Sequence, residues 1–201
     1  MNVWAKKICL GVALAGLAGG LGGCASTLIG ASATAGIAVA QERSVGAAVD
    51  DTTISAEINQ RLYKESEVLF GSVDLEVVEG RVLMTGNVQK PDHRIEAARI
   101  AWQVEGVREV LNELEIKDQS TLRDLAKDTW ITTQLRVRFL GDAELLAINY
   151  TIDTLNGVVY LFGIAQSQAE LDRATGHARN IQGVVRVVSH VVLKDDPKRK
   201  R

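Results

Sequence analysis

The chain has 201 residues, of which 46% are hydrophobic and 24% are charged, and its formal net charge is -2. These values are typical of a folded globular protein and exclude a largely disordered chain. The weak negative charge also argues against a protein that binds nucleic acid through an overall basic character, so we expect no nucleic-acid partner.

Residues 1–23 have the features of an export signal. Lys6 and Lys7 precede a glycine-interrupted apolar run that ends at Cys24. The run is shorter than the roughly 20 apolar residues that cross a bilayer, which favours a cleaved signal over a permanent anchor. Loss of the two lysines would change the net charge from -2 to -4.

The sequence "LGGC" at 21–24 resembles the lipobox of bacterial lipoproteins, whose cysteine is acylated after cleavage. This resemblance implies lipidation of Cys24, and Ala25 in place of aspartate implies sorting to the outer membrane, on its periplasmic face. Several acyl chains on one residue exceed the single chain that gives marginal membrane binding, so the anchor would be stable. The alternative is a secretory signal that ends in a chance cysteine. Residues 24–49 are rich in alanine, glycine and serine and predict a flexible linker.

The rest of the chain is a tandem duplication with an offset of 77 residues, which aligns Asp51-Thr52 with Asp128-Thr129 and needs no gap. Such a period indicates two copies of one small domain. We place the copies at 50–118 and 127–195, with a linker at 119–126 and a basic tail at 196–201.

Each copy predicts a helix, a hairpin, a second helix and a strand. The first helix follows a capping aspartate, Asp51 or Asp128, and repeats apolar residues every fourth position. Its predicted core residues are Ile54, Ile58 and Leu62 in the first copy and Ile131, Leu135 and Phe139 in the second.

The hairpin turns at Glu79-Gly80 in the first copy and at Asn156-Gly157 in the second, where both residues accept positive φ. The second helix ends at Gly106 or Gly183, which we expect to be C′ glycines. The result is an α+β fold in which each copy has a three-stranded mixed sheet with two helices on one face. Whether the copies pack together does not follow from the pattern.

The chain offers no pattern typical of catalysis. Its three histidines, His93, His177 and His190, are scattered, and it has neither a nucleophile motif nor a phosphate loop. The acidic residues of the first copy's strands alternate with apolar residues, which predicts a solvated sheet face; they include Glu76, Glu79, Glu113 and Glu115. We therefore expect no enzyme, no cofactor and no metal site.

Two exported α+β repeats with this glycine spacing resemble BON domains of bacterial envelope proteins. The strings "RSVGAAVDD" at 43–51 and "DTWITTQLR" at 128–136, behind a lipobox, resemble the dual-BON lipoproteins of the Gram-negative outer membrane. This resemblance implies a non-enzymatic protein that supports envelope integrity, concentrates at the division site and binds anionic phospholipid, such as phosphatidylglycerol, through the first helix of its second domain. The implied lipid-binding residues are Asp128, Thr129, Trp130, Thr133, Gln134, Arg136 and Val137. Gln134 departs from the lysine of that family.

The duplication also allows Trp130 to be compared with its own counterpart. Trp130, Thr133 and Val137 lie on the outward side of the helix and correspond to Thr53, Ala56 and Gln60 in the first copy. Tryptophan favours the headgroup region of a membrane, and Arg136 and Arg138 can reach phosphates. Arg61 occupies the place of Arg138 in the first copy, which weakens that assignment.

Charge distinguishes the copies as well. Residues 51–119 hold 8 basic and 14 acidic side chains, a net charge of -6, whereas residues 128–196 hold 6 and 8, a net charge of -2. An anionic membrane would repel the first copy more strongly.

Two alternatives stay open. Trp130 could pack between the domains or under the 119–127 link, and the protein would then be a periplasmic adaptor that binds envelope proteins. The tail "PKRKR" is either solvated or a second, salt-sensitive membrane contact.

Overall fold

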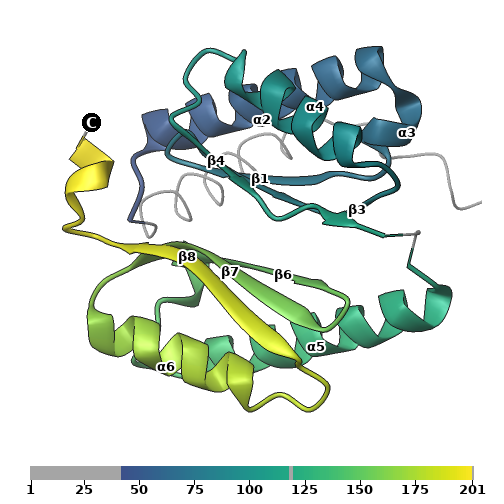
Figure 1. Ribbon diagram of the computed structural model, residues 1–201. Helices are drawn as coiled ribbons and strands as arrows, with labels where there is room; N and C mark the ends of the chain where they lie inside the picture. The colour runs from purple at the N-terminus through teal and green to yellow at the C-terminus, as the bar shows by residue number, and fades with distance from the viewer. Residues whose placement is uncertain (1–41, 118–119, 201) are drawn as a thin grey trace, which may run out of the picture. The chain divides into compact units, whose positions relative to one another are not determined.

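The computed structural model describes residues 42–117 and 120–200 (Figure 1). The predicted signal, Cys24 and most of the predicted linker at 24–49 lie outside the described residues. The described part belongs to one compact unit, Ile37–Arg201. Because this unit contains its own hydrophobic cores, we expect it to fold without the segment that precedes it.

Each repeat has the predicted α+β architecture. The first contains α2 (Val45–Glu65), α3 (Glu67–Phe70), β1 (Asp74–Val78), β2 (Arg81–Thr85), β3 (Asn87–Val88), α4 (Pro91–Trp102), β4 (Glu109–Asn112) and β5 (Glu115–Ile116). The second contains α5 (Leu122–Gly141), the 3-10 helix η1 (Ala147–Asn149), β6 (Tyr150–Leu155), β7 (Val158–Ala165), α6 (Gln168–Arg179) and β8 (Arg186–Leu193), and a 3-10 turn, η2 (Pro197–Lys200), follows.

The sheet orders are β1-β2-β4 and β6-β7-β8, and in each sheet the first pair is antiparallel and the second pair is parallel. The short strands β3 and β5 form a separate parallel pair. In each repeat the two long helices lie on one face of the sheet (Figure 1). The predicted three-stranded mixed sheet with two helices on one face is therefore confirmed.

The predicted start of the first helix in each repeat is wrong. The N-caps are Ser44 and Thr121, which lie seven residues before Asp51 and Asp128. The Ser44 hydroxyl accepts a hydrogen bond from the Ala47 amide, and Thr121 forms a reciprocal capping box with Asp124. These caps satisfy amides of the first turn, so parts of both predicted linkers, residues 45–49 and 122–126, are helical.

Asp51 and Asp128 are instead buried in the middle of their helices and bind the hairpin turns. The Asp51 carboxylate accepts hydrogen bonds from the amides of Glu79 and Gly80, at 2.9 and 2.8 Å. The Asp128 carboxylate accepts the equivalent bonds from the amides of Asn156 and Gly157, at 2.7 and 2.8 Å. Each carboxylate thus joins the first helix to the turn between the first two strands.

Both central residues of each turn have left-handed backbone conformations. Glu79 and Asn156 have φ angles of 54° and 52°, and the glycines that follow have φ angles of 71° and 77°. Such angles are unfavourable for a residue with a Cβ atom, whereas they suit the two-residue turn of a hairpin. Gly106 and Gly183 also have positive φ, but each lies in the turn beyond its helix and not at C′.

The two repeats have separate cores, and the predicted helix residues fill them. Ile54, Ile58 and Leu62 are buried in the first core, and Ile131, Leu135 and Phe139 are buried in the second. Burial of such side chains stabilises the fold by about 1.5–3 kcal/mol each.

A third apolar cluster joins the two sheets to each other. It contains Val78 and Leu83 of the first sheet and Val158, Tyr160, Phe162, Ile164 and Val192 of the second. The Arg81 guanidinium lies over the Phe162 ring, 5.1 Å from its centroid, and donates a hydrogen bond to the His190 carbonyl. The repeats therefore pack through the sheet faces that their own helices leave uncovered.

This packing corrects the prediction of a solvated sheet face. A Glu113 oxygen lies 2.8 Å from a His190 ring nitrogen, and Glu115 accepts a hydrogen bond from the Asn156 side chain. Glu79 forms an ion pair with Arg199. The acidic residues alternate with apolar ones because they surround an interface between repeats, which one repeat's pattern does not reveal.

Equivalent residues of the two repeats meet at this interface. Glu113 and His190 are 77 residues apart, as are Glu76 and Asp153. Burial, and then the nearby Asp153 carboxylate, raise the pKa of Glu76, while the cations of Arg136 and Arg43 partly oppose the shift. The first pair can attract, whereas the second pair repels when both carboxylates are ionised.

We predict that Asp51→Ala lowers the free energy of unfolding by about 3 kcal/mol, because two turn amides would lose a charged acceptor. The measurement is chemical denaturation of residues 37–201. The matched control is Asp50→Ala, an exposed neighbour, for which we expect a change within about 0.5 kcal/mol. Equal effects of the two substitutions would contradict the anchoring role of Asp51.

We predict that Glu76→Gln raises the melting temperature by about 1–2 °C near neutral pH. The folded protein holds the Glu76 proton to higher pH than the unfolded chain does, so stability falls as pH rises from 4.5 through the raised pKa. The difference from wild type should vanish when pH is lowered below this window. A destabilised variant at neutral pH would show that Arg136 and Arg43 outweigh the repulsion.

Candidate functional site

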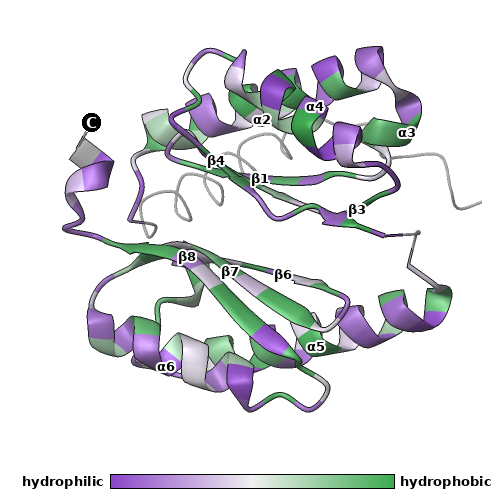
Figure 2. Ribbon diagram, in the orientation of Figure 1, coloured by the Kyte–Doolittle hydropathy of each residue, from purple (hydrophilic) through white to green (hydrophobic). Residues whose placement is uncertain are grey.

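Helix α5 combines a buried side with an exposed apolar side. Ile131, Leu135 and Phe139 face the core, while large apolar side chains on other positions stay exposed. These exposed residues are Leu122 at 85%, Leu125 at 49%, Trp130 at 47%, Val137 at 62% and Leu140 at 78%. Hydrophobic residues accordingly recur along α5, including its first turn (Figure 2).

Trp130 does not pack between the repeats. It is 47% exposed and belongs neither to the core of its repeat nor to the cluster between the sheets. Asp128 lies two residues before it, about 200° away around the helix, and is held inside by the hairpin turn. Fixing Asp128 inward therefore turns Trp130 outward.

The helix period places four of the exposed residues on one stripe. Leu122, Trp130, Val137 and Leu140 fall within about 80° of one another on the helix surface. Ala126 and Thr133 lie between them on the same side, and both are exposed. With a rise of about 1.5 Å per residue, the stripe extends along nearly 30 Å of helix.

The predicted lipid-binding residues divide into three groups. Thr129, Trp130, Thr133 and Val137 lie on or next to the stripe, and all four are exposed. Gln134 and Arg136 lie on opposite flanks, and the Arg136 cation is near enough to Glu76 to lower the pKa of that carboxyl. Asp128 is 5% exposed and bonded to the turn, so its assignment to the surface is wrong.

The cation of Arg138 has a structural contact. Its guanidinium donates a hydrogen bond to the Asn180 carbonyl at the C-cap of α6, at 3.2 Å. Carbonyls at a helix end favour a cation, so Arg138 joins α5 to α6.

The sequence prediction missed the first turns of α5, which bring Leu122, Arg123 and Lys127 to the surface. Arg123 and Lys127 lie about 20° and 60° from Trp130 around the helix, on the side of the stripe opposite Arg136. All three side chains are exposed. The signal was present as Thr121 and Asp124, a capping-box pair three residues apart.

The complete first helices of the two repeats differ in the sign of their net charge. α5 carries four basic and two acidic residues, a net charge of +2, and its acids are the capping Asp124 and the buried Asp128. α2 carries two basic and four acidic residues, a net charge of -2. Lys127 corresponds to Asp50, so the sign of the exposed charge is reversed beside the stripe.

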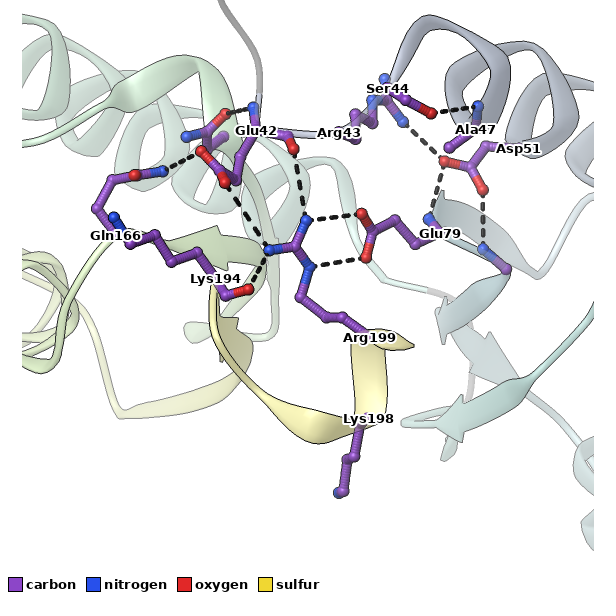
Figure 3. Close-up of polar contacts among 12 residues, drawn as sticks. Glu42, Arg43, Ser44, Ala47, Asp51, Glu79, Gln166, Lys194, Lys198 and Arg199 are labelled. Carbon is purple, nitrogen blue, oxygen red and sulfur yellow. Dashed lines mark hydrogen bonds and ion pairs between the residues drawn. The ribbon is translucent and has the colours of Figure 1, made fainter. Parts of the chain in front are cut away.

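Part of the basic tail contacts both folded repeats. The Arg199 guanidinium binds both carboxylate oxygens of Glu79, at 2.9 and 2.8 Å, and the carbonyls of Lys194 and Glu42, at 2.6 and 3.4 Å (Figure 3). Hydrogen bonding to Glu79 raises the pKa of Arg199. Lys198 points away from these contacts (Figure 3) and is exposed. Arg199 is therefore a clasp between the two repeats and not a free cation.

The described residues contain neither a helix that is long and apolar enough to cross a membrane nor a group of three or more acidic or histidine side chains placed to hold a metal ion.

A family model, the BON domain, matches residues 50–118 and 127–195. An uncharacterised protein of Anaplasma centrale, named for its place in the gshII 5′ region, is 44% identical over 147 residues, which are 73% of this chain and 96% of that protein. The outer membrane lipoprotein DolP of Haemophilus influenzae is 33% identical over 170 residues, which are 84% of this chain and 87% of that protein.

We predict that Arg199→Ala lowers the free energy of unfolding by about 2 kcal/mol, because the largely buried Glu79 carboxylate would lose its charged partner. Lys198→Ala, one residue earlier in the same tail, should change stability by less than about 0.5 kcal/mol. Denaturation curves of residues 37–201 measure both. If the two variants were equally stable, Arg199 would not be a clasp.

Proposed function

The chain belongs to the BON-domain family, and from this membership we propose that it is an outer-membrane lipoprotein, acylated at Cys24, whose second domain docks on anionic phospholipid through α5. The output is binding and not catalysis. The similarity to an outer membrane lipoprotein of Haemophilus influenzae supports the location, because it extends over 84% of this chain. The lipobox supports the anchor.

The observation that carries the lipid proposal is the exposed stripe of Leu122, Trp130, Val137 and Leu140. An amphipathic helix of this kind lies in the plane of a membrane interface with its apolar side inserted, and tryptophan favours that depth. Insertion of each large side chain contributes about 1 kcal/mol to the binding free energy, because only the exposed part of its apolar surface can be transferred to the membrane. Arg123 and Lys127 can each add about 1 kcal/mol near an anionic leaflet.

These terms sum to about 6 kcal/mol, which corresponds to docking at tens of micromolar for a protein free in solution. An acyl anchor changes this balance because a short tether gives a millimolar effective concentration. The 18 residues from Cys24 to Glu42 can reach about 60 Å at most, so an anchored molecule always lies near the surface. Anchor and helix together would keep the second repeat docked.

Charge selects which repeat faces the lipid. The first repeat has a net charge of -6 and its helix α2 one of -2, so an anionic surface repels it. The +2 charge of α5 favours the opposite orientation. The resemblance implies a lysine at the position of Gln134, and Lys127 supplies a cation on the same flank.

The resemblance further implies enrichment at the division site and a role in envelope integrity, which we include in the proposal. Anionic lipid gathered there would concentrate the docked protein. The second candidate, a periplasmic adaptor for envelope proteins, is compatible with α5 docking because it would use other surfaces.

The test is flotation of residues 37–201 with phosphatidylglycerol vesicles. We expect Trp130→Thr combined with Val137→Gln, which install the residues of the first repeat, to reduce partitioning at least about tenfold, a change of 1.4 kcal/mol. Binding should weaken at high salt and with zwitterionic vesicles, because the cations contribute.

Tyr63→Thr combined with Val49→Gln is the matched control, since these residues are 58% and 60% exposed on α2. It should float like wild type. Unchanged flotation of the α5 variant would refute docking through this helix. In cells, a labelled full-length protein with Trp130→Glu should lose septal enrichment; retention at septa would separate localisation from lipid docking.

A further inference from the structure

Helix α4 of the first repeat exposes its own tryptophan. Trp102 is 55% exposed and Ile95 is 67% exposed. They are seven residues apart, so they lie on one side of the helix, about 20° from alignment. Ala98 lies between them. This outward face of α4, defined by Ile95, Ala98 and Trp102, packs against no described core.

The second repeat shows that the fold does not require these side chains. α4 and α6 have the same length, and their inward residues are alanines that are completely buried: Ala97 and Ala101 in α4, Ala174 and Ala178 in α6. On the outward side, however, Asp172 and Arg179 replace Ile95 and Trp102. The outward face of this helix is therefore apolar in the first repeat and polar in the second.

Charged residues of both signs lie around the α4 face, and the exposed Lys90 and Arg94 are among its cations. Arg99 pairs with Glu96, and Arg61 pairs with Glu57, so these cations are neutralised locally. Asp92 and Glu105 are exposed and form no ion pair among the described residues.

Beyond the end of α4 lies a hollow of about 630 Å³, whose lining includes two exposed acids, Asp50 and Glu105. Arg108 and Arg199 also line it. However, the Arg108 guanidinium binds the Lys198 carbonyl, and the Arg199 guanidinium binds the Glu79 carboxylate. A long basic side chain of a partner could enter such a hollow while an apolar residue covers Trp102.

We propose that the α4 face binds a protein partner that presents an apolar side chain flanked by lysine or arginine, such as a cationic amphipathic helix. Charge complementarity selects this occupant, because the first repeat carries a net charge of -6 and would be repelled by anionic lipid. Exposed tryptophan surrounded by charged groups is typical of protein interfaces. This inference goes beyond lipid docking, which uses a different helix of the other repeat.

The proposal assigns one exposed tryptophan to each task. Trp130 contacts lipid and Trp102 contacts protein, so a molecule docked through α5 would hold a basic partner at the membrane. The two surfaces do not share a residue, and each can therefore be removed without the other.

The test uses residues 37–201 and a labelled synthetic amphipathic peptide of lysine and leucine, with fluorescence anisotropy as the readout. Ile95→Asp combined with Trp102→Arg installs the residues of the second repeat and leaves the net charge unchanged. We expect affinity for the peptide to fall at least about tenfold, whereas flotation with phosphatidylglycerol vesicles should stay at the wild-type level.

The matched control is Val68→Asp combined with Val49→Arg, which makes the same charge-neutral change at residues that are 53% and 60% exposed on α3 and α2. It should bind the peptide like wild type. A peptide with glutamate in place of lysine should not bind. Equal losses in the α4 variant and this control would overturn the proposal.

A single-tryptophan reporter separates the other occupants. With Trp130→Phe, Trp102 is the sole tryptophan of residues 37–201, and its emission should shift to the blue with the cationic peptide. A shift with phosphatidylglycerol vesicles instead would make the face a second lipid surface and overturn the proposal. Sedimentation as a dimer that Ile95→Asp and Trp102→Arg abolish would assign the face to self-association and overturn it as well.

Discussion

A buried aspartate in each repeat ties the first helix to the hairpin turn, and the orientation of the outer surface depends on it. Asp128 binds the amides of Asn156 and Gly157, the two central residues of the turn, both of which have left-handed backbone conformations. The carboxylate and the buried Ile131, Leu135 and Phe139 hold the same side of α5 against the sheet. Since Trp130 lies about 200° from Asp128 around the helix, the interaction that closes the fold also exposes the indole.

The packing of sheet against sheet decides where function can reside. Because each sheet is covered by helices on one face and by the other repeat on the second, its strands have little accessible surface left for a ligand. Equivalent residues meet at this interface, as in a symmetric dimer. The Glu113 carboxylate and the His190 ring can attract each other, whereas the carboxylates of Glu76 and Asp153 repel each other when both are ionised. The outward faces of the helices are then the surfaces that can differ freely between the repeats.

Much of the fold was predictable because it is encoded in short-range patterns. The duplication, the alternation along the strands and the Asn156-Gly157 turn depend on residues close in sequence, so two copies could be checked against each other. The helix starts were missed because an aspartate before an apolar period suits an N-cap, although its partner was a distant turn. Arg199 could not be assigned from its local sequence, since its partner Glu79 lies 120 residues away. For the candidate site, Trp130 and Val137 were found by comparison of the repeats, whereas Leu122 and Lys127 required the true helix start.

Duplication explains why the two apolar faces lie on different repeats. A single domain that carried both a basic helix for lipid and an acidic surface for a basic partner would place opposite charges close together, and each would weaken the attraction of the other. Separation into two repeats allows α5 to carry +2 and the first repeat to carry -6 within one molecule. The sheet interface and the Arg199 clasp hold the two charged surfaces apart, so in the proposed docking mode an anionic membrane would attract α5 without drawing in the first repeat.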